Sequence, residues 1–357
     1  MKRWSIPCAA LILIVSAWAQ DKPIIRGGSP NSGKPDQSLW EKELLKDRIP
    51  SNAVELQLKY SFPLENEIEK NEIFFKSIFN VSVDSRGHIY VPDYQLCVVY
   101  EFAKDGKFLS KYAKKGQGPG ELQNPHNVMF DKDRIVVMDL STDRIAYFDR
   151  DWTYLNSLRL IKSYYPFAIG KNSEIYCYDR HQERSLVIHD PQGKEIKVVE
   201  TAYYPDRKKS PLNSVLMRMS PWDTVWIIYK ALGIVREYSL EGAVLKEMNL
   251  LNVSSDYVKA NKKENENWEK KGLNQHYEII KDVAFLNGNA YLTGGGLVKP
   301  IFQIDGSGKV NNVFFIKPQF RAFRVCFHVG LDEDGREEFY VLNDNDGERS
   351  IGVYGRK

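Results

Sequence analysis

The sequence predicts an all-β protein folded as a six-bladed β-propeller with four-stranded blades. Three observations lead to this fold class. One kind of hairpin recurs six times, a second kind follows it five times, and one strand near the N-terminus has no hairpin partner of its own. Each repeating unit is about 40–48 residues long, which is the size of a four-stranded blade.

The first hairpin consists of an apolar strand, a tight polar turn and a strand rich in Ile, Val or aromatic residues. Asp, Asn and Gly separate strands in this way because they tolerate the backbone conformations of tight turns. Its six turns are residues 84–87, 131–134, 171–174, 220–223, 287–289 and 332–335.

The second hairpin follows about 20 residues later in each blade-sized unit. Its five turns are residues 104–106, 150–151, 191–193, 240–242 and 305–308. The sixth unit stops at residues 351–354, where this turn would come. Residues 54–60 alternate apolar and polar side chains, and we expect them to pair with 351–354. This pairing closes the ring and leaves no unpaired strand edge at its centre. The alternative, a β-sandwich with an extra domain, explains neither the six first hairpins against five second hairpins nor the unpaired strand at 54–60.

The N-terminus has the features of a cleaved secretory signal peptide over residues 1–19. Lys2 and Arg3 precede an apolar run at 9–15, and residues 17–19 form a small-x-small cleavage site. The apolar run is too short for a membrane anchor, which needs about 20 residues. We therefore expect a secreted or periplasmic protein without a membrane span.

The mature chain divides into a leader and one domain. Residues 20–50 form a leader rich in Gly, Pro and Ser, with a short helix expected near its end, and residues 51–357 form the propeller. Residues 252–278 are the one large break in the repeat, an insertion between blades. Residues 262–271 within it are nearly all Lys, Glu and Asn, so the insertion is either a helical flap over the channel mouth or a solvated surface excursion.

Composition excludes two classes of protein. The chain is 43% hydrophobic and 27% charged, which allows a sizeable core and excludes wholesale disorder. Its 50 basic and 47 acidic residues give a net charge of +3, which falls to +1 once the signal peptide is removed, so no nucleic-acid partner is predicted. The mature cysteines Cys97, Cys177 and Cys326 allow at most one disulfide, and buried free thiols are favoured.

A family resemblance supports the fold. Its residues are 116–122 (Gly-Gln-Gly-Pro-Gly-Glu-Leu), Pro125, Val128, Asp131, 135–139, Asp143, Arg144, Ile145 and Phe148, with Asp84, Gly87, Ile89, Tyr90, Val91 and Asp93 in the first blade. Over residues 79–150 this pattern resembles the NHL repeat, and beyond them only the hairpin spacing continues. The resemblance implies a six-bladed propeller of a type that bacteria often place outside the cytoplasm.

Candidate binding residues lie where loops share one face of the propeller. The loops joining strands two and three of each blade meet there with the segments that join blades, and loops on a rigid scaffold commonly carry binding. The candidates are Asp93, His126, Asp139, Arg180, His181, Trp268, His328 and Asp344. The alternative role of Asp93 and Asp139 is to accept backbone N–H bonds within their turns. Trp268 distinguishes a lid from a surface excursion, because only a lid would pack it into the mouth.

His126 and His328 fall at the start of innermost strands, close to the channel. Some lyases of the NHL type, which this chain resembles, hold a metal there with several histidines. No third histidine is expected on an innermost strand, so we predict no cofactor, and a divalent cation in the central channel remains the alternative.

The sequence favours a non-catalytic binding module for a protein, peptide or glycan, met on the face that carries the blade-joining loops. It contains no Ser/His/Asp constellation in a known spacing and no nucleophile elbow. The alternative is a hydrolase or lyase centred on the channel, of lactonase or lyase type, that uses a metal or loop carboxylates. Carboxylates that only the fold brings together leave no sequence pattern.

Overall fold

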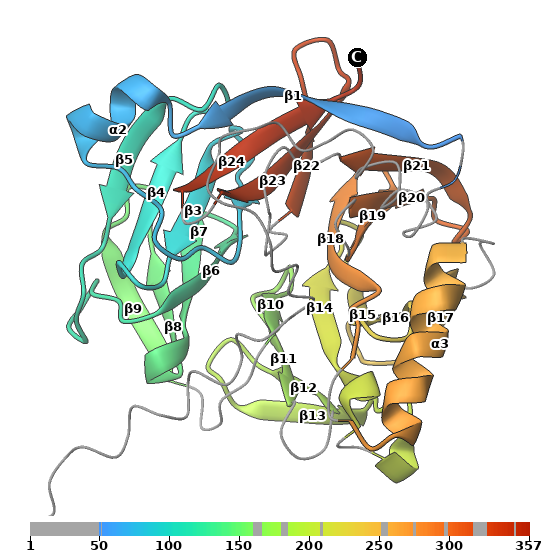
Figure 1. Cartoon of the computed structure of the whole chain (residues 1–357). Coiled ribbons are helices and arrows are strands. Elements are labelled where there is room, and N and C mark those ends of the chain that lie inside the picture. The colour runs from blue at the N-terminus through green and yellow to red at the C-terminus, as the bar shows by residue number, and fades with distance from the viewer. Residues whose placement is uncertain are drawn as a thin grey trace, which may run out of the picture. The chain divides into compact units, whose positions relative to one another are not determined.

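The computed structural model describes residues 50, 52–159, 166–179, 185–207, 210–250, 256–273, 276–295, 299–316, 327–345 and 348–357. All of them belong to one compact unit of the chain. They form six blades of four strands, and neighbouring strands within a hairpin are antiparallel (Figure 1). The six-bladed propeller predicted from the repeating hairpins is confirmed. The predicted signal peptide and the helix expected near the end of the leader lie outside the described residues.

Each blade runs from an innermost strand beside the channel to an outermost strand at the rim. Blades one to three contain β2 (Ser82–Val83), β3 (Ile89–Asp93), β4 (Val98–Phe102), β5 (Phe108–Tyr112), β6 (Pro125–Asp131), β7 (Arg134–Asp139), β8 (Arg144–Phe148), β9 (Tyr154–Arg159), β10 (Phe167–Ile169), β11 (Ile175–Asp179), β12 (Ser185–His189) and β13 (Glu195–Glu200). Blades four to six contain β14 (Val215–Met219), β15 (Val225–Tyr229), β16 (Ile234–Tyr238), β17 (Val244–Asn249), β18 (Ile280–Leu286), β19 (Asn289–Gly294), β20 (Lys299–Ile304), β21 (Val310–Ile316), β22 (Phe327–Leu331), β23 (Glu337–Asn345), β24 (Glu348–Gly355) and β1 (Val54–Phe62).

Burial falls from the second strand of a blade to the fourth. Every residue of β3 and β15 is buried, because both faces of these strands meet neighbouring blades. The outermost strand β13 is largely exposed, β5 alternates half-buried and exposed residues, and both strands carry Lys or Glu among their apolar residues. Charged side chains on an edge strand discourage pairing with other chains.

Several of the hairpin turns are closed by the same pair of hydrogen bonds. In five of the described turns an aspartate oxygen Oδ1 accepts the backbone N–H groups two and four residues ahead, at 2.8–3.1 Å. These residues are Asp84, Asp149, Asp190, Asp305 and Asp332, and the Ser239 hydroxyl does the same in blade four. Asp is frequent in the predicted turns because its short side chain satisfies backbone donors that the ladder leaves free.

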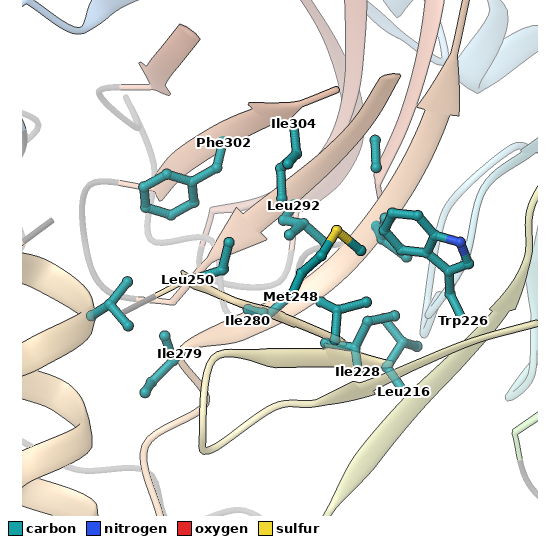
Figure 2. Close-up of a cluster of buried hydrophobic side chains, with 14 of the residues drawn as sticks. Leu216, Trp226, Ile228, Met248, Leu250, Ile279, Ile280, Leu292, Phe302 and Ile304 are labelled. Atoms are coloured by element: carbon teal, nitrogen blue, oxygen red, sulfur yellow. The ribbon is translucent and has the colours of Figure 1, made fainter. Parts of the chain in front are cut away.

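Six clusters of buried apolar side chains hold the blades together, one at each seam between neighbours. Figure 2 shows the cluster between blades four and five, which contains Trp226 and Ile228 from blade four and Leu292 and Phe302 from blade five. The cluster between blades one and six contains Val91 and Tyr340, so the ring is continuous across the ends of the described chain.

The N-terminal strand β1 closes the ring, as predicted. It pairs antiparallel with β24, with Leu58 opposite Tyr354 and Phe62 opposite Ile351. It also pairs in parallel with β21, with Leu56 opposite Ile316, a contact that the sequence did not predict. Blades five and six therefore form one eight-stranded sheet, in which β1 lies between β21 and β24 (Figure 1).

Two α-helices occur in the described part of the chain. The short helix α2 (Glu65–Asn71) follows β1 and buries none of its residues, and it corrects the expectation that the domain is β apart from its leader and insertion. The helix α3 (Asp256–Lys270) forms the inter-blade insertion. No helix among the described residues is long and apolar enough to cross a membrane. Cys97 and Cys177 are buried free thiols, and Cys326 lies outside the described residues.

Closure by β1 makes a prediction for Leu56, which is 3% exposed and packs between blades five and six. Replacing Leu56→Ala is expected to lower the free energy of unfolding by about 2–4 kcal/mol, because a cavity opens where β1 meets both blades. Urea denaturation of the purified chain measures this change in the free energy of unfolding. Leu109→Ala on β5, where the side chain is 42% exposed, is the control and should change stability by less than about 1 kcal/mol. Equal effects of the two substitutions would contradict a closing role for β1.

Candidate functional site

Strand direction divides the propeller into two faces. Innermost strands start, and second strands end, at one face, which also carries the segments that join blades; we call it the loop face. The hairpin turns anchored by aspartates lie at the opposite face, the turn face. The described candidate residues Asp93, His126, Asp139, Trp268 and His328 all lie on elements at or near the loop face.

Asp93 is fully buried at the end of β3 and holds a loop together. Its Oδ2 accepts the N–H groups of Lys76 (2.5 Å) and Ser77 (2.9 Å), and its Oδ1 accepts those of Gln95 and Leu96 (3.0 Å each). The carboxylate therefore joins the segment before β2 to the loop after β3. Asp93 therefore fixes the backbone of the loop face and does not project from its surface.

Asp139 occupies the matching place in blade two and is also fully buried. It accepts the N–H groups of Gln123 (3.0 Å) and Asn124 (2.8 Å) and an Nη2 bond from Arg144 (3.2 Å). Arg144 also donates to backbone carbonyls of the Gly-rich linker, including Gln117 at 3.2 Å. Asp139 and Arg144 together hold the Gly-rich linker against the end of β7.

His126 belongs to a stack of three rings at the loop face of blades one and two. The Phe79 ring lies 4.6 Å from that of Tyr94 at 20° and 4.7 Å from that of His126 at 17°. The three residues come from the segment before β2, the loop after β3 and the start of β6, and all are half-buried. We call this set the aromatic slab.

Two asparagines adjoin the aromatic slab in sequence. The Nδ2 of Asn80 donates to the Oδ1 of Asn127, and the Asn80 Oδ1 accepts the N–H of Val81 at 2.9 Å. The Ser82 hydroxyl donates to the Val128 carbonyl at 2.6 Å. These bonds join the innermost strands of blades one and two side by side.

His328 is the second residue of β22 and lies 5.8 Å, ring to ring, from Tyr340. Its side chain keeps partial exposure, but the surrounding protein removes most of its hydration. Burial lowers the pKa of His328 to about 4, because desolvation disfavours the charged imidazolium. At neutral pH His328 is an uncharged group on the innermost strand.

An ion pair spans the innermost strands of blades four and five. The Nη2 of Arg218 on β14 lies 2.8 Å from the Oδ1 of Asp282 on β18, which also accepts the Val283 N–H at 2.8 Å. Burial raises the pKa of Asp282 despite the opposing effect of Arg218. A carboxyl with a raised pKa is the kind of group that general acid catalysis uses, but here the arginine and a backbone amide already engage it.

A second charged group lies nearby on the loop face. Glu278, just before β18, pairs with Lys230 and lies 3.5 Å from the Nζ of Lys281. Although burial acts to raise it, the two lysines lower the pKa of Glu278. This carboxylate is held ionised between two cations.

The insertion helix α3 is docked on blades four and five. The Tyr257 hydroxyl accepts the N–H of Gly295 (2.8 Å), and Asn265 donates to the carbonyl of Ala231 and accepts the N–H of Tyr277 (2.8 and 2.5 Å). Near its C-terminal end, Glu269 pairs with Arg207 at 2.8 Å. The helical part of the prediction is correct, and these contacts attach the helix to the loops of two blades.

The structure describes only part of the remaining candidate binding residues. Trp268 on α3 is half-buried, and its role as the marker of a lid stays a prediction. Arg180 and His181 lie outside the described residues, and of Asp344 only the backbone is described, paired with Arg349. Over the described stretches of the chain, no three His, Cys, Asp or Glu side chains are grouped so that they could hold a metal ion.

Sequence reasoning missed Phe79, Tyr94 and the Arg218–Asp282 pair. Tyr94 directly follows the aspartate that was singled out, so a half-exposed aromatic in that loop was a usable signal. Arg218 and Asp282 each interrupt a strand that is otherwise mainly apolar. Their pairing left no signal, because the two strands belong to different blades.

Residues 63–288 match the model of a protein family, DUF5128, described as a 6-bladed beta-propeller. No curated protein matches the chain. The family match agrees with the six blades of the structure and confirms the predicted class of fold. The finer resemblance to the NHL repeat stays a prediction.

Solved structures agree on the fold. A putative exported protein from Bacteroides fragilis superposes with a TM-score of 0.59 at 14% identity, covering 86% of this chain and 96% of that one. The WD40 propeller domain of Doa1 gives 0.51 at 10% identity, covering 85% and 98%. A streptogramin B lyase gives 0.50 at 9% identity, covering 85% and 88%. At such identities the likeness shows the fold alone.

The buried clamp of blade two makes a prediction for Asp139. Replacing Asp139→Ala removes the carboxylate that pairs with Arg144 and leaves two backbone N–H groups without their acceptor, so we expect the free energy of unfolding to fall by about 3–5 kcal/mol. The matched control is Asp334→Ala, which removes an exposed pair with Arg336 (3.2 Å) and should cost less than about 1 kcal/mol. Chemical denaturation measures both. A small effect at Asp139 would show that water replaces the carboxylate.

The lowered pKa of His328 predicts a pH dependence of stability. The imidazole has a pKa of about 4 when folded and about 6.5 when unfolded, so the unfolded chain takes up the proton first as the pH falls. The contribution of His328 is complete above pH 6.5 and is lost between pH 6.5 and 4, at about 1.4 kcal/mol per pH unit. Urea denaturation at pH 7 and pH 5 should show a steeper loss in the wild type than in His328→Gln. Parallel losses would contradict a buried, neutral histidine.

Proposed function

Given that the chain belongs to the DUF5128 family of 6-bladed beta-propellers, we propose that it acts outside the cytoplasm as a non-catalytic binding module. Its partner is a protein, peptide or glycan that meets the loop face. The signal-peptide features of residues 1–19 support the location. The similar Bacteroides fragilis structure, which is described as exported, supports it too.

One observation carries this proposal: four acidic groups at the loop face already hold the scaffold together. Asp93 caps backbone N–H groups, Asp139 and Asp282 are each paired with an arginine, and Glu278 is paired with two lysines. A catalytic carboxylate has to reach a substrate, and these carboxylates are committed to the protein itself. The half-exposed aromatic slab, next to Asp93, is suited to contact with a partner.

Rigidity supports the same function. The docking of α3 and the capping of the loops hold the loop face in place before a partner arrives, through Tyr257, Asn265 and Asp93. A surface that is already ordered loses little conformational entropy on binding, which favours affinity.

A pair of charge substitutions tests the proposal. Gln95→Arg changes an exposed side chain on the loop face, and Asp334→Arg changes an exposed side chain on the turn face. Partners retained from extracellular material by the immobilised wild type are purified, and their affinities are measured by calorimetry. We expect Gln95→Arg to weaken binding at least about fivefold, because it alters the contact surface, and Asp334→Arg to leave it within about twofold.

Two results would overturn the proposal. In the first, binding depends on Asp334 and not on Gln95, which places the partner on the turn face. In the second, metal analysis finds a stoichiometric divalent ion that is lost in His126→Ala or His328→Ala, which favours the channel-centred enzyme.

A further inference from the structure

We propose that the aromatic slab, together with the amides of Asn80 and Asn127, is a subsite for a neutral saccharide. This inference rests on the proposed binding function and names the class of partner. The ligand would place the apolar C–H face of a sugar ring against the slab and its hydroxyls against the amides.

The slab is a preorganised stack of rings, in which Tyr94 and His126 cover the two faces of Phe79, so a sugar ring adds to the outer face of Tyr94. Interplanar angles of 20° and 17° make the Tyr94, Phe79 and His126 rings nearly parallel, with Phe79 in the middle. The Tyr94 N–H donates to the Ser77 carbonyl at 3.0 Å, and the carboxylate of Asp93 fixes the residues on either side. Since the three rings already stack in the protein, little ordering is needed when a ligand adds to them.

The neighbouring side chains offer neutral hydrogen bonds. Each asparagine amide has two N–H donors and one acceptor oxygen. The contacts of Asn80 and Asn127 within the described residues engage one of the four N–H groups of the pair. Asn127 is buried and orients Asn80, so the half-buried Asn80 amide is the group placed to meet a sugar hydroxyl, while an aromatic ring packs well against the apolar side of a sugar.

Charge favours a neutral ligand over an ionic one. Asp93, the nearest carboxylate in the sequence, is buried and accepts four backbone N–H bonds, so it offers little to a cation. In blade two, the guanidinium group of Arg144, which would suit an anion, is paired with Asp139. A ligand at the slab therefore gains from stacking and neutral hydrogen bonds.

The test uses the mature chain with four neutral hexasaccharides, built from β-linked glucose, α-linked glucose, mannose or xylose. Isothermal calorimetry gives the affinities, and electrophoresis through gels containing the matching polysaccharides gives an independent readout. We expect at least one sugar to bind, and Tyr94→Ala to weaken that binding at least about tenfold. Phe74→Ala removes an aromatic ring that is 56% exposed and outside the slab, and should leave the affinity within about twofold.

Several outcomes overturn the saccharide assignment. It fails if none of the four sugars binds, if only a charged oligogalacturonate binds, or if Tyr94→Ala and Phe74→Ala weaken binding equally. It also fails if the loop face retains only peptides or proteins, an outcome in which the proposed binding function stands. If the loop face retains no sugar, peptide or protein, both the saccharide assignment and the proposed binding function are wrong. Circular dichroism and thermal unfolding of each variant show that the comparison is made between folded proteins.

Discussion

The pairing of β1 with two blades at once is the constraint on which the rest of the structure depends. Its residues Val54–Leu56 pair with β21, and Gln57–Phe62 pair with β24. A ring of blades has no stable open form of the same shape, because opening it exposes two apolar seams. By joining the beginning of the domain to its last two blades, β1 removes those edges.

Closure also reaches the candidate site. Phe62, the last residue of β1, packs with Phe102 at 5.0 Å and belongs to the cluster that holds Ile78 and Val81. The segment that carries Phe79 and Asn80 lies between those two residues. The strand that closes the ring therefore helps to set the position of the aromatic slab, so the stability of the ring and the proposed binding surface depend on the same strand.

Much of the architecture could be predicted, because each blade shows local patterns of alternating apolar residues and of turn residues. The turns at 84–87 and 305–308, and the missing strand at 54–60, could be found from alternation and turn residues alone. The helix α2 was missed because none of its seven residues is buried, so it has no apolar stripe. The parallel pairing of Leu56 with Ile316 was missed because it joins distant residues and needs no turn. Tyr94 and Asp282 were missed as site residues since their partners come from other strands or blades.

By itself, the sequence determined the number of blades, the strand that closes them and the places where His126 and His328 enter innermost strands. The length of the blade repeat and the residues of its turns are local properties of a chain. The one strand without a hairpin partner could therefore be assigned to the one blade that lacked a fourth strand. Only the tertiary structure decided what the polar side chains do. It turned Asp93 and Asp139 inward onto backbone N–H groups, joined Arg218 to Asp282, and stacked three rings from separate segments. The role of a side chain depends on which groups the fold brings within a few ångströms of it. The distance between two side chains that are far apart in the sequence cannot be read from the order of the residues.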